Sequence, residues 1–200
     1  MPKETDFHRE LINDLRAQNV MLAKVPDTPA SYVMGRENQK FRFSPRKFVD
    51  LVGVGNEVVG GSSSNEIFLW GRPLIWEAKL MKTLHAWPIK SLGEDQLKVL
   101  RTFEDRACSR VIINYRVKKY TDAQVAKYGL ERFVERKRLN MLTSVRPSDI
   151  LEAIQHGWKS IPVAELAKTF IMRPWGKQWN YTEIITGSTW TPQWPSDSNN

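Results

Sequence analysis

Charged side chains interrupt two apolar segments of the sequence. Asp50 lies within KFVDLVGVG, and Glu77 and Lys79 lie within PLIWEAKL. A charge in such a strand is costly unless it is paired, solvated or in use. Alternate side chains of an extended strand point the same way, so Glu77 and Lys79 share one face. The apolar neighbours of Glu77 share the opposite face.

Neighbouring strands would bring Asp50 and Glu77 together. Two close carboxylates repel unless a cation neutralises them, and Mg²⁺ takes a few carboxylates while keeping several waters. Such an ion can activate water and stabilise charge on a phosphoryl oxygen, and Lys79 can stabilise developing negative charge. The pattern is therefore consistent with phosphodiester hydrolysis. It is equally consistent with an ordinary surface strand, because Glu-Ala-Lys is common in such strands.

The composition describes a globular chain with an excess of positive charge. Its 200 residues carry a net charge of +8 at pH 7, with a pI near 9.6, which favours an anionic partner. A lone cysteine, Cys108, is expected to be a small core residue and fits a reducing cytoplasm. No apolar run of about 18 residues is present and the polar start does not resemble a secretory signal, so we expect a cytoplasmic protein without a membrane span. Three scattered histidines and one cysteine make a zinc site of the usual types improbable.

Basic residues concentrate between positions 116 and 138. This segment holds eight basic and three acidic residues. One interpretation is a surface that faces nucleic acid. The alternative is a solvated helix whose Glu and Arg side chains keep the chain soluble.

The apolar periodicity predicts an α/β layered domain. Helices are expected at 6–19, 93–107, 122–138, 148–156 and 162–170. Strands are expected at 20–24, 47–55, 66–71, 73–80 and 110–117, with a tight turn joining 66–71 to 73–80. The segments 35–47 and 60–65 are expected to be loops. Helix 93–107 should turn Leu97, Leu100 and Phe103 inward.

Several motifs in this order resemble the PD-(D/E)xK nuclease superfamily and, more narrowly, the RecU-type Holliday-junction resolvases. Asp50 followed by Glu77-Ala78-Lys79 matches the superfamily signature. The helix RELINDLRAQNV leading to MLAKVPDTP, the block IWEAKLMKTLHAWPIKSLGEDQLKVL, the strand RVIINY and the late KSIPVAELAKT are similar to elements of the resolvases. The likeness spans about residues 8–170 and is strongest from 73 to 117.

The resemblance implies a restriction-endonuclease-like fold with a central mixed sheet, at 1–174, followed by a C-terminal tail at 175–200. It implies that Asp50, Glu77 and Gln96 hold Mg²⁺, for which Mn²⁺ could substitute, and that Lys79 stabilises the transition state. Phe48 stands where the family has a threonine ligand and cannot ligate. Glu10, on the early helix, or a water could take that place.

The function implied is Mg²⁺-dependent cleavage of branched DNA, above all of four-way junctions, by a C₂ homodimer. The alternatives are another PD-(D/E)xK endonuclease and a catalytically silent DNA-binding module. The basic residues expected to contact DNA are Lys24, Arg46, Lys47, Lys82, Lys90, Lys118, Lys119, Arg132, Arg136, Lys137 and Arg138.

Tryptophans are frequent near the C-terminus. Stacking on unpaired bases is one role for them, and packing of the C-terminal extension is the role we favour. The residues are Trp158, Trp175, Trp179, Trp190 and Trp194.

Overall fold

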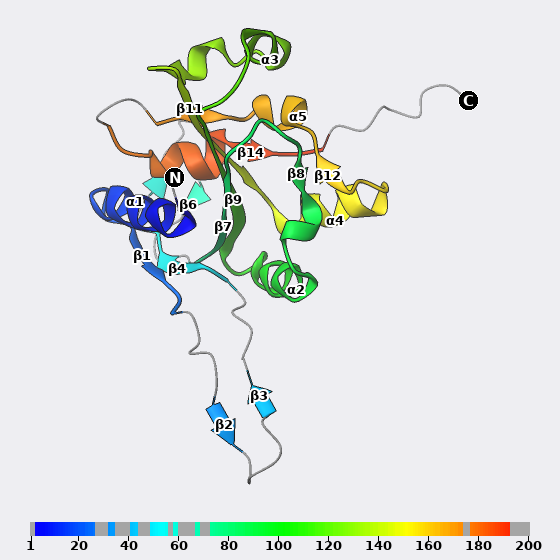
Figure 1. Ribbon diagram of the computed structural model, residues 1–200. Helices are drawn as coiled ribbons and strands as arrows, with labels where there is room; N and C mark the ends of the chain where they lie inside the picture. Colours follow the sequence, from blue (N-terminus) through cyan, green and yellow to red (C-terminus); the bar gives the residue numbers. More distant parts are fainter. Residues whose placement is uncertain are drawn as a thin grey trace.

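A mixed β-sheet forms the middle layer of the computed structural model (Figure 1). The structure describes residues 3–26, 32–34, 41–43, 49–55, 58–59, 67–68, 73–173 and 177–192. The strand order is β1 (Met21–Lys24), β4 (Leu51–Val54), β7 (Pro73–Met81), β9 (Cys108–Val117), β11 (Arg138–Val145) and β10 (Val134–Glu135). β7 and β9 are parallel, and the other neighbours in this order are antiparallel.

Shorter elements complete the chain. β13 (Ile171–Met172) and β14 (Thr189–Trp190) also pair with β11. Three small pairs are β2 (Tyr32–Met34) with β3 (Phe41–Phe43), β5 (Val58–Val59) with β6 (Ile67–Phe68), and β8 (Trp87–Pro88) with β12 (Ser160–Ile161). The helices are α1 (Glu4–Arg16), α2 (Glu94–Phe103), α3 (Asp122–Tyr128), α4 (Pro147–Gln155) and α5 (Val163–Ala167). The 3₁₀ turns η1 (Ile89–Ser91) and η2 (Glu131–Phe133) and the π-helical turn η3 (Glu183–Gly187) connect them.

The two faces of the sheet carry separate apolar cores. On one face, α1 and the segment around η3 pack Phe7, Leu11 and Trp179 against Trp76 of β7. On the other face, helices α2 to α5 pack against the alternate residues of β9, which are Val111, Ile113, Tyr115 and Val117. The α/β class predicted from the sequence is therefore confirmed, and so is the alternation along β7, because Trp76 and Ala78 are fully buried in the α1 core.

The helix predicted at 122–138 is wrong beyond Tyr128. Thr121 and Gln124 form a reciprocal capping box at the start of α3, and Gly129 ends the helix in the left-handed conformation at φ 62°. The chain then forms a β-hairpin whose turn residues Arg136 and Lys137 both have positive φ. This geometry is typical of a two-residue type I′ turn. The alternative of a solvated helix bearing Glu–Arg pairs therefore fails for this segment.

Other boundaries differ in detail from the predictions. β7 has β4 and β9 as its two neighbours, so its expected pairing with segment 66–71 is wrong. The loops at 35–40, 44–48 and 60–65, and the turn residues 71 and 72, lie outside the described residues. α2 ends at Phe103, which is 42% exposed and does not turn inward, although Leu97 and Leu100 do. β11, which pairs along seven positions with β9, was not predicted.

Residues 177–192 belong to the folded domain, although the sequence placed them in a tail. Trp179 is fully buried, and Trp190 is 1% exposed, so packing is the role of these two tryptophans. Trp158 is half-buried and lies 6.2 Å from Trp190 between ring centres. Trp175 and Trp194 lie outside the described residues. Cys108 is buried, as predicted.

The helices of the described residues were also compared with the length and hydropathy that a bilayer requires. None of them is both long enough and apolar enough to cross a membrane.

Candidate active site

Asp50 lies immediately before β4, where the pairing of β4 with β7 ends. Its backbone N–H donates to the carbonyl of Trp76 at 3.2 Å, and its own carbonyl accepts from Val25 at 2.8 Å. Its carboxylate Oδ2 accepts the backbone N–H of Ala78 at 3.1 Å. The side chain thus replaces the missing ladder acceptor for β7, which fixes the carboxylate close to Glu77.

Glu77 is the most deeply buried carboxylate of the site, at 1% exposure. Its Oε1 accepts a hydrogen bond from Lys79 Nζ at 2.6 Å and another from Gln96 Nε2 at 2.8 Å. Its Oε2 is buried and has no hydrogen-bond partner among the described residues. Glu77 therefore offers one carboxylate oxygen that no protein donor occupies.

Burial raises the pKa of Glu77 from 4.5 to about 7, and repulsion from Asp50 adds to the effect. The ammonium of Lys79 lowers the pKa of Glu77 and offsets part of this rise. Asp50 also raises the pKa of Glu77 through a hydrogen bond, which two carboxyl groups make only when they share a proton. The two acids predicted from the sequence are therefore brought together, with Lys79 beside them.

Gln96 reaches the site as a hydrogen-bond donor. It lies in the first turn of α2, where its Oε1 accepts the backbone N–H of Gly93 at 3.1 Å and its Nε2 points to Glu77. The oxygen that a metal would need is engaged in capping the helix. In this arrangement Gln96 holds Glu77 in position, whereas the resemblance implies that it is a ligand.

The structure does not bring Glu10 to the two acids. Glu10 Oε1 accepts from Arg116 at 2.6 Å and from the indole of Trp179 at 3.0 Å, and Arg173 lies 3.6 Å away. His8 comes close instead, with Nε2 3.7 Å from Asp50 Oδ2. Residues two positions apart point about 200° from each other around a helix, so α1 directs only one of the two toward Asp50.

His8 was missed because a single histidine in an apolar helix face gives no distinctive signal. It shares the buried side of α1 with Leu11 and Leu15, three and seven positions later. The described residues contain no ready-made cluster of three or more His, Cys, Asp and Glu side chains that could hold a metal ion. Phe48, Arg46 and Lys47 lie outside the described residues.

Basic side chains gather at the far end of β9 and β11. Lys118 follows β9 and Arg138 begins β11, whose first register pair is Leu139 with Val117. Six predicted DNA contacts here are exposed, namely Lys118, Lys119, Arg132, Arg136, Lys137 and Arg138. We call these six residues the basic tip. Since Glu77 pairs with Val111, the tip begins roughly 20 Å along the sheet from Glu77.

Three other predicted DNA contacts lie apart from the basic tip. Lys82, directly after β7, and Lys90, in η1, are exposed. Lys24, at the end of β1, is half-buried.

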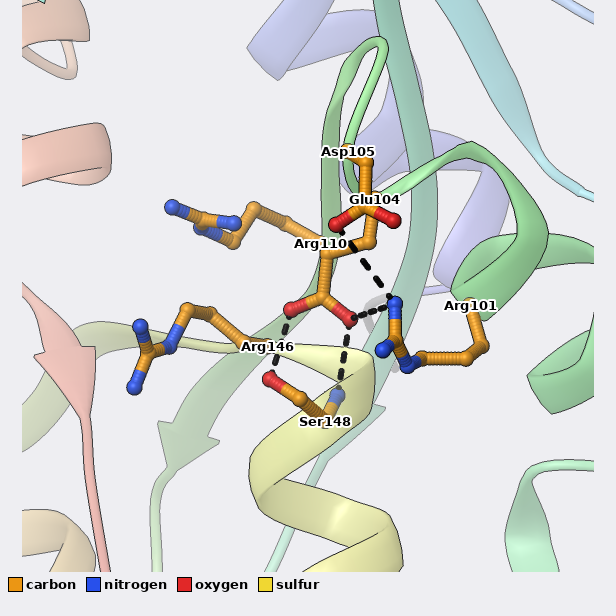
Figure 2. Close-up of a pocket in the computed structure, with 6 residues that line it drawn as sticks. All are labelled: Arg101, Glu104, Asp105, Arg110, Arg146 and Ser148. Carbon is orange, nitrogen blue, oxygen red and sulfur yellow. Dashed lines mark hydrogen bonds and ion pairs between the residues drawn. The ribbon is translucent and has the colours of Figure 1, made fainter.

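A polar hollow of about 380 Å³ lies between the C-terminal end of α2 and the start of α4 (Figure 2). In Figure 2, Glu104 points to Ser148, from which it accepts backbone and hydroxyl hydrogen bonds of 3.0 and 2.7 Å. Arg101 lies 3.6 Å from Glu104, and Arg146 forms a bidentate pair with Asp149 at 2.8 Å. These cations are balanced by carboxylates, so the hollow is a polar joint between two helices.

Comparison with known proteins adds no family assignment. No family model matches the sequence, and no curated protein matches it significantly.

Proposed function

We propose that this chain is a divalent-metal-dependent DNA endonuclease that acts on branched DNA, above all on four-way junctions. The observation that carries the proposal is the meeting of Asp50 and Glu77 beside Lys79, with Glu77 Oε2 buried and without a partner among the described residues. Buried polar atoms are normally paired, and exceptions point to a functional role or an absent ion. Perturbed carboxyl groups also tend to mark functional sites.

The donor set suits a hard divalent cation. Asp50 and Glu77 would hold Mg²⁺ or Mn²⁺ through carboxylate oxygens, which are the ligands that these ions prefer. When bound, the ion would neutralise the paired carboxylates and supply Lewis-acid stabilisation for charge on a phosphoryl oxygen. The raised pKa of Glu77 has the same origin as this affinity, because a cation removes the repulsion that favours the protonated acid.

Lys79 has the reach and charge to act on the substrate. Its side chain is 18% exposed, whereas that of Glu77 is 1% exposed, so the ammonium group connects the buried acids to solvent. Held by Glu77 at 2.6 Å, it would face the phosphate that the acids approach and stabilise the negative charge that develops there. Gln96 would keep Glu77 oriented through its 2.8 Å hydrogen bond.

The excess of positive charge supports a nucleic-acid substrate. The net charge is +8, and the basic tip offers exposed cations within about one duplex diameter of the acids. Preference for a four-way junction rests on the resemblance to the RecU-type resolvases. Cutting two symmetry-related strands needs two active sites, which a C₂ homodimer supplies.

The test is cleavage of an end-labelled four-way junction and of a linear duplex with the same arm sequences, in Mg²⁺ and in Mn²⁺. We expect paired, symmetrical cuts in the junction and little cutting of the duplex. Equal cutting of both substrates would refute junction selectivity and leave the nuclease. Absence of cutting in either metal would refute the nuclease.

A silent DNA-binding module is the second candidate. Three observations favour it: Oε1 of Glu77 is already satisfied by Lys79 and Gln96, the described residues contain no complete metal cluster, and Phe48 replaces the threonine ligand. Such a module would bind the junction with a steep salt dependence and would leave its phosphodiester bonds intact in both metals.

A further inference from the structure

His8 is a buried imidazole that the roles assigned above do not use. It is 4% exposed, and neither ring nitrogen has a hydrogen-bond partner among the described residues. Its nearest charged atom is Asp50 Oδ2, 3.7 Å from Nε2. That separation exceeds the length of a good hydrogen bond. The ring is therefore directed at the site without being satisfied by it.

Unpartnered atoms thus collect around Asp50. They are the two ring nitrogens of His8 and Oε2 of Glu77. A neutral imidazole always has one nitrogen with a free lone pair, and a carboxylate oxygen has only lone pairs. Acceptors cannot satisfy one another, but a single cation between them can satisfy several at once.

We infer that His8 is a protein ligand of the divalent cation held by Asp50 and Glu77. The inference rests on the proposed metal site and adds a nitrogen donor to it. Two donors bound to one ion at about 2.1 Å lie about 3.0 Å apart at a right angle and about 3.4 Å apart at the tetrahedral angle. The observed 3.7 Å between His8 and Asp50 needs a movement of only a few tenths of an ångström.

The position of His8 on α1 supports this role. The helix packs its buried side against β7 through Phe7, Leu11 and Leu15, all fully buried, so the backbone that carries His8 is held firmly. The imidazole enters from the α1 side of the sheet, while Gln96 enters from the α2 side. The cation would therefore have ligands or supporting groups from both helical layers.

A nitrogen ligand changes which metals the site prefers. Imidazole suits Mn²⁺, Co²⁺ and Zn²⁺, whereas Mg²⁺ prefers an all-oxygen set. We expect the protein to bind Mn²⁺ more tightly than Mg²⁺, and removal of the imidazole to reduce this difference. A purely structural His8 would leave metal preference unchanged.

The test is electron spin-echo envelope modulation of the Mn²⁺ complex of the full chain, combined with calorimetric titration of Mn²⁺ and Mg²⁺. Wild-type protein should show coupling of Mn²⁺ to a directly bound ¹⁴N nucleus. H8Q should lose the coupling and bind Mn²⁺ at least about tenfold more weakly, with a smaller loss for Mg²⁺. H85Q is the matched control, because His85 is an exposed histidine, and it should behave as wild type.

The spectrum of the wild-type complex decides the matter even if H8Q fails to fold. Bound Mn²⁺ without ¹⁴N coupling would overturn the role of His8 while leaving the carboxylate site and the proposed nuclease intact. Coupling that persists in folded H8Q would also overturn it. Failure of wild-type protein to bind either metal would instead remove the proposed metal site, and His8 as a ligand with it.

Discussion

Gln96 donates a 2.8 Å hydrogen bond to the same oxygen of Glu77 that Lys79 contacts at 2.6 Å. Both donors converge on Oε1, and the other oxygen, Oε2, has no partner among the described residues. This asymmetry orients the carboxylate toward Asp50. Glu77 is therefore held for a ligand by residues that are not ligands themselves.

Replacing Gln96 should weaken catalysis without removing it. Q96A loses the hydrogen bond that orients Glu77, so we expect kcat to fall by about 10- to 100-fold with the Mn²⁺ site still present. Q96E places a second acid beside Glu77 and should be worse than Q96A at neutral pH. Single-turnover cleavage and Mn²⁺ titration measure the two effects. Complete loss of Mn²⁺ binding in Q96A would show that Gln96 is a ligand.

The raised pKa of Glu77 predicts a pH-dependent cost in stability when no metal is present. The pKa is 4.5 ordinarily and about 7 in the fold, so between these values the unfolded chain binds fewer protons than the folded chain. The stability due to this group is fully present below about pH 4.5 and is lost as pH rises through 7.

E77Q should therefore be more stable than wild type at pH 8 in a chelator, by up to about 3 kcal/mol, and should lose that advantage near pH 4.5. Urea denaturation at the two pH values measures the difference. Mn²⁺ at pH 8 should stabilise wild type and leave E77Q unchanged. An equal difference at both pH values would contradict the account.

Trp179 ties the C-terminal segment to α1. Its indole N–H donates to Glu10 at 3.0 Å, its backbone N–H donates to Asp14 at 3.0 Å, and its carbonyl accepts from Gln18 at 2.6 Å. W179A should destabilise the domain by about 3–5 kcal/mol, because the side chain is fully buried. W179F keeps most of the apolar burial and loses the bond to Glu10, so it should cost less. Guanidinium denaturation measures both, and a negligible effect of W179A would refute the role.

The basic tip should supply DNA affinity without supplying chemistry. A variant with Lys118, Arg136 and Lys137 changed to glutamine should bind DNA more weakly, with a shallower dependence on salt by about 0.9 per lost phosphate contact. Its Mn²⁺ affinity should be unchanged. K168Q is a suitable control, because Lys168 is an exposed cation paired with Glu165 on α5. Fluorescence anisotropy at several salt concentrations measures the slopes, and an unchanged slope would contradict this role.

Local patterns were sufficient to predict the acids of the site. Asp50 and Glu77 stood out because charge interrupts apolar strands, and alternation placed Lys79 beside Glu77. Partners such as Ala78 for Asp50 depend on strand register, which a sequence does not state. His8 and Glu10 show the same limit, because which of two nearby helix residues faces the site depends on how α1 packs.

The errors around α3 came from giving charge pairing more weight than capping. Thr121 and Gln124 are a recognisable helix start, and Gly129 is a recognisable helix end. The net charge of 116–138 suggested one long helix instead. The C-terminal segment was misplaced for a different reason: Trp179 is buried by contacts with residues about 165 positions earlier, such as Asp14, and local composition carries no trace of them.

Metal-dependent cleavage by matched variants tests the central claim most directly. End-labelled four-way junction is incubated with Mn²⁺ and equal amounts of wild type, D50N, E77Q or K79A, each shown to be folded and to bind the junction. We predict cleavage by wild type that a chelator abolishes, and a loss of at least about a thousandfold in D50N and E77Q. Cleavage by D50N or E77Q at the wild-type rate would contradict the claim that these two acids form the catalytic site.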